Sequence, residues 1–293
     1  MRPKILIISP IRNEGAYIER TIQSLIQQKT GIQEWIIVDD NSTDNSASII
    51  QRYAKRHSWI HYLKKPGHRH RHVGGGVVDA FNYGLKHVKN KDYDYICKMD
   101  GDITFGPNYI TTLLNIFKND SKLGAASGKF YDGEAEKRLS RTSDDMVVGA
   151  FNFYRRTCYE SIGGFVQEVM WDGIAFHRAR MQGWKTRSID HPDLNFVHLR
   201  PMGSSQKSIY VGRLRWGRGQ YFMGTHPLYM LCIFLFRSVE KPYFIGGFLI
   251  LLGYLWAWAR RLPRYENPAF RQSLHAWQYQ RVIGLLKLNK KLL

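Results

Sequence analysis

Acidic residues are almost missing from the last third of this 293-residue chain. Residues 201–293 hold 14 lysines and arginines against two aspartates and glutamates, whereas residues 1–200 hold 29 against 22. A region that is basic and apolar together indicates an anionic partner, either lipid or nucleic acid. We therefore expect two parts, an α/β domain at 1–200 and a membrane-associating helical region at 201–293.

Cysteines are also scarce. The three present, Cys97, Cys158 and Cys232, have no metal-like spacing, which fits a reducing compartment without structural disulfides. The apolar run Ile5–Ile8 is too short for the core of a signal peptide and is followed closely by Pro10. We therefore expect the catalytic part to be cytoplasmic.

No G-x-G-x-x-G follows the first apolar run, which disfavours a nicotinamide site. What the chain does contain is a regular alternation of apolar runs and amphipathic segments, the pattern of a doubly wound nucleotide-binding sheet. Strands are predicted at 4–9, 34–39, 59–63, 95–99, 123–130, 149–154 and 184–189, and helices at 18–26, 46–56, 77–89, 107–119, 157–163 and 174–182.

The most informative stretch is the buried strand Tyr95–Met99, which ends in Asp100-Gly101-Asp102. In an open α/β sheet, ligands bind at the carboxyl ends of the strands. Two carboxylates on such a turn are suitable ligands for Mg²⁺ or Mn²⁺, and these ions commonly bind the phosphates of a diphosphate. The alternative is an ordinary polar turn, because Asp-Gly is a common turn dipeptide.

Two other polar stretches have competing interpretations. Asp172 lies just before a predicted helix and is either an N-cap or a functional carboxylate. The segment 64–76 alternates histidine and arginine before three glycines, which favours a basic loop that meets phosphates over a metal site.

The basic region contains two runs of 18 residues without a charge, Gly219–Phe236 and Pro242–Ala259. We expect apolar helices that enter one leaflet of a membrane, with tryptophan and arginine at the headgroups. A single membrane span by the second run and a soluble dimer interface are the alternatives. A single span is opposed by the basic residues of 260–293, which it would place on the far side.

Four motifs in order resemble the family-2 glycosyltransferases of GT-A fold. These are Pro10-x-x-Asn13-Glu14, Val38–Asp44, Asp100-Gly101-Asp102, and Asp172 before a helix with Arg178 and Gly183. The resemblance covers roughly residues 1–190 and includes the segment from Tyr154 to Phe165. It implies a Rossmann-like, doubly wound mixed sheet and inverting transfer from a nucleotide-diphosphate sugar. The basic, apolar helices expected from the composition would form a C-terminal appendage to this fold.

By this resemblance, residues of the first loop (Pro10, Arg12, Asn13 and Glu14) and Asp39 or Asp40 bind the nucleotide sugar. Asp102, with Asp100, would bind the Mg²⁺ or Mn²⁺ that bridges the diphosphate. Asp100 would also contact the nucleotide sugar. Asp172 would be the general base that removes a proton from the acceptor hydroxyl, on a glycan or a lipid-linked acceptor.

The sequence departs from the family pattern in two places. Trp171-Asp172 stands where Glu-Asp is common, and Gly212-Arg-Leu-Arg-Trp216 stands where processive members carry Gln-x-x-Arg-Trp. The missing glutamine argues against processive polymerisation, while Arg215 and Trp216 are expected to meet diphosphate and sugar or, alternatively, a membrane. His198 is an additional candidate for a metal ligand or an acceptor contact.

Two other functional classes remain open at this point. A nucleotidyltransferase on the same sheet would release pyrophosphate instead of a nucleoside diphosphate. A non-catalytic adaptor would use its basic residues to bind a membrane or nucleic acid. Nucleic acid is disfavoured because the carboxylates near position 100 would repel phosphate without a metal.

Overall fold

The structure is a computed structural model that describes residues 3–67, 75–200, 208–240 and 242–289. Most of the predicted basic loop at 64–76 therefore lies outside the described residues. The chain divides into two compact units, Met1–Pro201 and Met202–Leu293, which are described separately.

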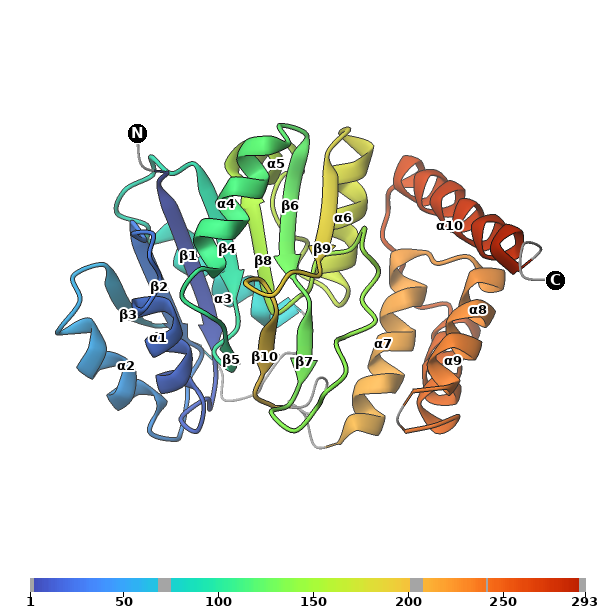
Figure 1. Ribbon diagram of the computed structural model, residues 1–293. Coiled ribbons are helices and arrows are strands. Elements are labelled where there is room, and N and C mark those ends of the chain that lie inside the picture. Colours follow the sequence, from blue (N-terminus) through green and yellow to red (C-terminus); the bar gives the residue numbers. More distant parts are fainter. Residues whose placement is uncertain (1–2, 68–74, 201–207, 241, 290–293) are drawn as a thin grey trace. The chain divides into compact units, whose positions relative to one another are not determined.

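The first unit is built on a mixed seven-stranded sheet of order β3-β2-β1-β4-β8-β6-β9 (Figure 1). Strands β3, β2, β1 and β4 are mutually parallel, and β8 runs antiparallel to its neighbours β4 and β6. The strands are β1 Ile5–Ile11, β2 Glu34–Asp39, β3 Ile60–Lys64, β4 Tyr95–Met99, β6 Leu123–Gly128, β8 Phe151–Arg155 and β9 Lys185–Ile189.

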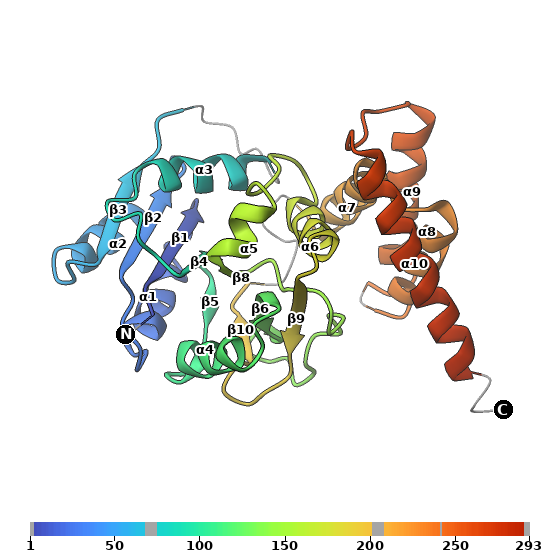
Figure 2. The same ribbon diagram turned by 90° about the horizontal axis from the view of Figure 1, so that it is seen from above.

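Helices cover both faces of this sheet, as Figure 2 shows from above. Alternate residues of β1 divide between the two cores, with Ile5 and Ile7 on one face and Leu6 and Ile8 on the other. Helices α1 Ile18–Ile26, α2 Ser46–Ala54 and α4 Tyr109–Asn119 pack on the first face, and α3 Gly75–Lys86, α5 Arg156–Ser161 and α6 Trp171–Met181 pack on the second.

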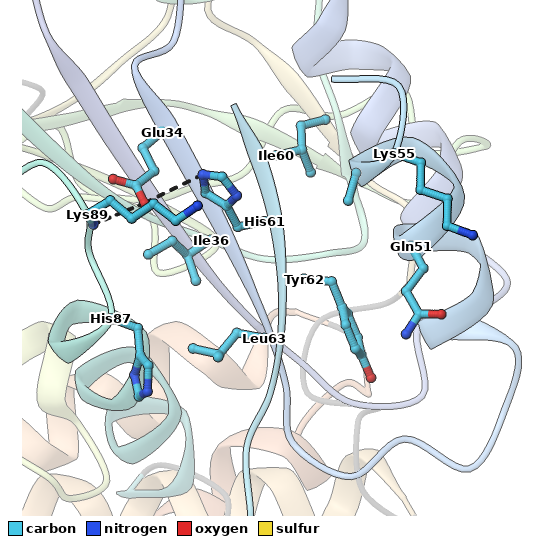
Figure 3. A pocket seen from close by; sticks show the side chains of 11 residues that line it. Glu34, Ile36, Gln51, Lys55, Ile60, His61, Tyr62, Leu63, His87 and Lys89 are labelled. Atoms are coloured by element: carbon cyan, nitrogen blue, oxygen red, sulfur yellow. Dashed lines mark hydrogen bonds and ion pairs between the residues drawn. The ribbon is translucent and has the colours of Figure 1, made fainter. Parts of the chain in front are cut away.

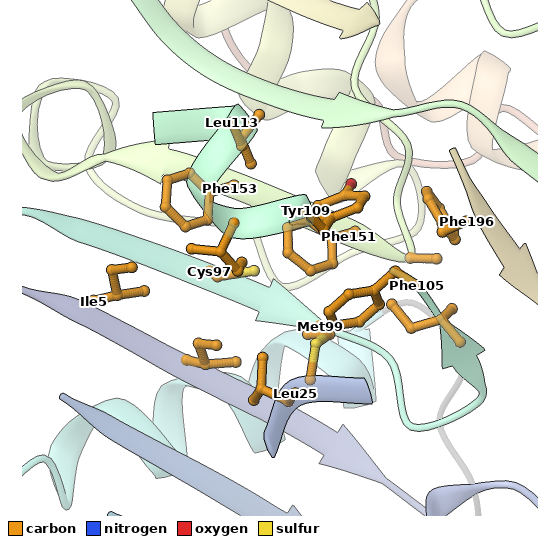
Figure 4. Packing of buried hydrophobic residues seen from close by; sticks show 14 of the residues in the cluster. Ile5, Leu25, Cys97, Met99, Phe105, Tyr109, Leu113, Phe151, Phe153 and Phe196 are labelled. Carbon is orange, nitrogen blue, oxygen red and sulfur yellow. The ribbon is translucent and has the colours of Figure 1, made fainter. Parts of the chain in front are cut away.

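The first of these cores is rich in aromatic rings beneath the end of β4. Tyr109 and Phe151 pack with their ring centroids 4.7 Å apart, and Met99 and Phe105 lie in the same buried cluster (Figure 4). The Tyr109 hydroxyl accepts a hydrogen bond of 2.8 Å from the Gly128 amide. This packing fixes the end of β4, from which the acidic turn departs.

A second, three-stranded sheet was not predicted from the sequence. It has the order β5-β10-β7, with β5 Ile103–Thr104, β7 Phe130–Asp132 and β10 Phe196–His198. The predicted strand at 123–130 is therefore wrong in its extent, because Lys129 separates β6 from β7 and the chain changes sheet there. These strands of two or three residues are too short to show a hydrophobic period.

The second unit is helical. Its helices are α7 Ile209–Met223, α8 Pro227–Ser238, α9 Ile245–Ala259 and α10 Pro268–Asn289. The first charge-free run does not form one helix, because Gly224 ends α7 with φ of 90° and Pro227 opens α8. Among the described residues, no helix is both long enough and apolar enough to span a bilayer.

Candidate active site

The carboxyl ends of β1, β2 and β4 lie side by side at one edge of the sheet because these strands are parallel neighbours. The first loop, the Asp39–Asp44 segment and the Asp100–Asp102 turn follow them directly. The antiparallel β8 begins at the same edge, where the Asp100 amide donates a 2.9 Å hydrogen bond to the Ala150 carbonyl. Most of the predicted site residues are therefore gathered by the topology alone.

Gly101 allows the acidic turn to pack closely against the first loop. A Cβ atom at this position would lie 2.8 Å from Ile11 Cγ2 and 3.1 Å from Ile18 Cδ1. The neighbouring carboxylates differ in exposure, since the Asp100 side chain is 30% exposed and that of Asp102 only 3%. Burial raises the pKa of Asp102 above its ordinary value, while His198 and Arg200 act in the opposite direction.

His198 joins the two aspartates through the small sheet. Antiparallel pairing of β10 with β5 sets His198 opposite Ile103, and the Leu199 amide donates to the Asp102 carbonyl at 2.8 Å. One side-chain donor atom each from Asp100, Asp102 and His198 then lie within 4.8 Å of one another. Almost a hundred residues of sequence separate the histidine from the turn.

These three side chains fit a divalent cation. Nδ1 of His198 donates to the carbonyl of Arg200, which directs Nε2 toward Asp102 Oδ1 at 3.8 Å, where a neutral imidazole would offer its lone pair to a cation. A lone pair facing a carboxylate is favourable when a cation lies between them, and the outer hydrogen bond is typical of a metal-binding histidine. Carboxylate oxygens are ligands that suit both of the predicted ions, Mg²⁺ and Mn²⁺.

Arg200 also contacts this group and was not predicted. Its Nη2 lies 2.7 Å from Glu14 Oε1 and 2.9 Å from Asp102 Oδ2, so one guanidinium bridges two buried carboxylates. Burial and the charge of Asp102 raise the pKa of Glu14 to about 7, although Arg200 acts to lower it. Arg200 thus offsets part of the cost of burying two like charges side by side.

The first loop and the Asp39–Asp44 segment hold each other in place. Asn13, at φ of 55°, accepts a 2.8 Å hydrogen bond from the Thr43 amide on its Oδ1, and its own amide donates to Ser42 Oγ at 3.0 Å. The Gly15 amide donates to Asp44 Oδ2 at 2.8 Å. The motif residue Asn13 therefore has a structural task, and its predicted contact with the nucleotide sugar stays a prediction.

Asp39 is buried at the end of β2, and both of its oxygens are engaged. Oδ1 accepts from the Ser42 amide and Oδ2 from the Tyr62 hydroxyl, each at 2.8 Å. Burial, together with this bond, raises the pKa of Tyr62 to about 12. Asp40 lies 3.7 Å from Lys65 Nζ, which also forms a closer ion pair of 2.7 Å with Asp79.

Asp172 lies within the first turn of α6, not before it. Met170, with φ of 67°, is the N-cap residue, which makes the N-cap interpretation of Asp172 wrong. Its carboxylate lies close to Gly149, because a Cβ atom added to Gly149 would lie 2.8 Å from Asp172 Oδ2. Burial raises the pKa of Asp172 above 3.8, while the Gly173 amide and Lys98 partly oppose that shift.

Lys98 links Asp172 to the acidic turn. This buried lysine of β4 donates from Nζ to the Gly149 carbonyl at 2.9 Å and forms a short ion pair with Asp100. Its Nζ also lies 5.3 Å from the centre of the Trp171 ring. Contacts through Lys98 thus connect the group of Asp100, Asp102 and His198 to Asp172, the candidate base. An isolated lysine in an apolar strand gave no signal for this role.

The remaining predicted residues stay untested. Pro10 is part of β1 and pairs with Val38, and Arg12 follows the strand directly. Arg215 and Trp216 belong to α7 in the second unit, where Trp216 lies under Arg237, 4.9 Å from its guanidinium carbon. Their contacts with a donor therefore remain predictions.

A cavity of about 500 Å³ lies elsewhere in the first unit, against the edge strand β3 (Figure 3). Glu34, His61 and Lys89 face it, and its lining includes no predicted site residue. His61 Nε2 lies 3.7 Å from Glu34 Oε1. We therefore place the active site at the acidic turn and not in this cavity.

Comparison with known proteins agrees with the geometry. The description Glycosyl transferase family 2 matches residues 6–183, and the chain belongs to that family. Among curated relatives, the poly-beta-1,6-N-acetyl-D-glucosamine synthase of Staphylococcus aureus (strain COL) is 22% identical over 273 residues, covering 82% of this chain. The chain spans only 62% of the length of that relative.

Solved structures with the same fold include a mannosyltransferase from Pyrobaculum calidifontis in complex with GDP-Man and Mn²⁺. It aligns with a TM-score of 0.57 at 17% identity, covering 97% of this chain and 81% of its own. TarS of S. aureus aligns with a TM-score of 0.55 at 14% identity, covering 81% and 44%. The predicted GT-A fold is thereby confirmed.

Proposed function

We propose that this protein is an inverting, metal-dependent glycosyltransferase that moves a sugar from a nucleotide-diphosphate sugar to a hydroxyl of a glycan, either lipid-linked or at the cell surface. The observation that carries the proposal is the group of Asp100, Asp102 and His198 together with Asp172 at one sheet edge. Structures similar to this chain were solved with GDP-Man and Mn²⁺ or with UDP, which supports such a donor.

Asp172 accepts the proton of the acceptor hydroxyl as the oxygen bonds to the anomeric carbon and the nucleoside diphosphate departs. Because burial raises its pKa, this carboxylate is a stronger base than a solvated aspartate. A single displacement inverts the anomeric configuration. A divalent cation held by Asp100, Asp102 and His198 would neutralise charge on the departing diphosphate.

The proposal includes a location at the cytoplasmic face of the cell membrane. The three free thiols fit a reducing compartment.

Family membership favours glycosyl transfer over the nucleotidyltransferase and adaptor alternatives.

The test is a screen of nucleotide-diphosphate sugars with the full-length protein and Mn²⁺ or Mg²⁺, reading the released product. We expect free nucleoside diphosphate, and loss of about a hundredfold or more in turnover for Asp172→Asn. Asp102→Asn should lose metal-dependent activity, while Asp144→Asn, an exposed carboxylate paired with Lys129, should retain it. Release of pyrophosphate would contradict glycosyl transfer, and wild-type turnover in Asp172→Asn would remove the assigned base.

A further inference from the structure

Exposed apolar side chains gather on one part of the second unit. Of the 18 large hydrophobic residues that are exposed in the described part of the chain, 13 lie between Leu228 and Trp258, on α8, α9 and their connection. Only Met181 belongs to the first unit. Contiguous apolar surface of this kind marks an interaction site on a folded protein.

The exposed residues form one stripe on each helix. Leu228, Leu231 and Leu235 recur at three- and four-residue intervals on α8. On α9, the residues Ile245, Phe248, Leu252 and Leu255 do the same. A helix that faced water would carry polar residues at these positions.

The opposite face of α9 already has its partners. Ile250 is fully buried, and a Cβ atom at Gly253 would lie 2.1 Å from the Leu214 carbonyl oxygen of α7. A Cβ atom at Gly247 would lie 2.6 Å from the Phe234 carbonyl oxygen of α8. Helix α9 thus buries its glycines with Ile250 and Tyr254 in the unit and exposes the apolar side chains of its other face. We call the exposed stripes of α8 and α9, with Val239, Tyr243 and Phe244 between them, the apolar face.

The connection between the two helices extends this face. Tyr243 and Phe244 are each 61% exposed, and Phe244 adopts a φ of 56° that is unusual for a bulky residue. The ring of Phe244 stacks on Phe248 with centroids 6.4 Å apart. The acidic residue of this segment, Glu240, is paired with Arg237.

The basic residues of this region indicate which kind of partner the apolar face binds. Residues 201–293 contain 14 basic residues and only two acidic ones, which favours an anionic partner over a second copy of this basic region. Arg260 and Arg261 are exposed where α9 ends, and the guanidinium carbon of Arg260 lies 6.0 Å from the Trp256 ring centre. Arginine and tryptophan beside large apolar side chains are the composition of a helix that lies in a lipid headgroup region. Nucleic acid would use the arginines but not the apolar stripes.

From these observations we infer that the apolar face docks on a bilayer that contains anionic lipids. The large side chains of α8 and α9 enter between the headgroups, and the arginines at the end of α9 lie against lipid phosphates. The inference does not depend on the proposed sugar transfer, because lipid binding is measured without a donor. It would bring the enzyme to the surface where a lipid-linked acceptor resides.

The experiment is co-sedimentation of the full-length protein with vesicles of phosphatidylcholine alone or mixed with phosphatidylglycerol. We expect binding to be at least tenfold tighter with the anionic lipid and to weaken with added salt. Replacing both Phe244 and Phe248 by serine should weaken binding to the anionic vesicles by tenfold or more. Arg260→Gln with Arg261→Gln should reduce the preference for anionic lipid.

Met181→Ser is the matched control, since it removes an exposed apolar side chain from the first unit and should leave binding unchanged. Because Phe244 and Phe248 are exposed, their serine variants should keep the wild-type melting temperature, which separates lost binding from misfolding. Equal binding of the double serine variant, or no vesicle binding by the folded wild type, would overturn the inference. So would a dimer in sedimentation velocity that the double serine variant abolishes.

Discussion

Asp172 can act as a base only when its carboxylate is unprotonated. Because burial raises its pKa, turnover should fall with decreasing pH through a value above 3.8, the ordinary pKa of aspartate. We expect an acidic limb in the pH profile of kcat/KM that disappears, with the activity, in Asp172→Asn. The measurement is initial-rate kinetics at saturating metal over a series of buffers.

Glu14 offers a competing origin for the same limb, since its own pKa is raised to about 7. Glu14→Gln separates the two groups, because it removes this titration while leaving Asp172 in place. If the acidic limb of the kcat/KM profile persists in Glu14→Gln, the assignment of Asp172 as the titrating base is supported. Loss of the limb there would assign the pH dependence to Glu14 and contradict our assignment of the base.

At the same scale, sequence reasoning named the carboxylates that the structure brings to this edge, and His198 beside them, but not the cations Arg200 and Lys98 that contact them. Asp39, Asp100, Asp102 and Asp172 follow strands or open a helix, and such positions are legible without coordinates. Arg200, by contrast, reaches Glu14 and Asp102 across a fold that brings distant segments together. A single basic residue at the end of a short strand carries no local pattern that would predict this contact.

At the scale of the elements, long apolar strands and periodic helices were predicted well, and short strands were not. β5 and β10 have two and three residues, so their pairing depends on tertiary context. The charge-free segment 219–236 gave no prediction of where its helices end, because the break lies in the conformation of Gly224 and in Pro227. The close packing of α7 on α9 was likewise not visible in the sequence.

That packing depends on glycine. A Cβ atom at Gly217 would lie 1.8 Å from the Ile250 carbonyl oxygen, so Gly217→Ala must force α7 and α9 apart. We expect a loss of about 1–3 kcal/mol in the free energy of unfolding, as for other overpacked contacts. Gly284→Ala is the control, since no described atom beyond its chain neighbours and its own helix backbone lies within 4 Å of the added Cβ, and alanine favours a helix. Urea denaturation followed by circular dichroism measures both, and equal stability of the two variants would contradict the close contact.

For the whole molecule, metal binding and folding should be coupled. Asp100 and Asp102 meet His198 only after the small sheet has formed, so the unfolded chain does not present these three ligands together. A cation that binds only the folded protein stabilises it by about 2.7 kcal/mol when its concentration is a hundredfold above Kd. The cation must also compete with Arg200 for Asp102.

Mn²⁺ should therefore raise the melting temperature of the wild type in a concentration-dependent manner, and EDTA should reverse the effect. Asp102→Asn should lose most of this increase because it removes one anionic ligand from a buried site. Asp144→Asn, which alters an exposed carboxylate, should keep the full increase and so reports nonspecific effects of the ion. Differential scanning calorimetry without any nucleotide sugar measures this directly. An unchanged increase in Asp102→Asn would show that the stabilising ion binds elsewhere, and the metal assignment at the acidic turn would then be wrong.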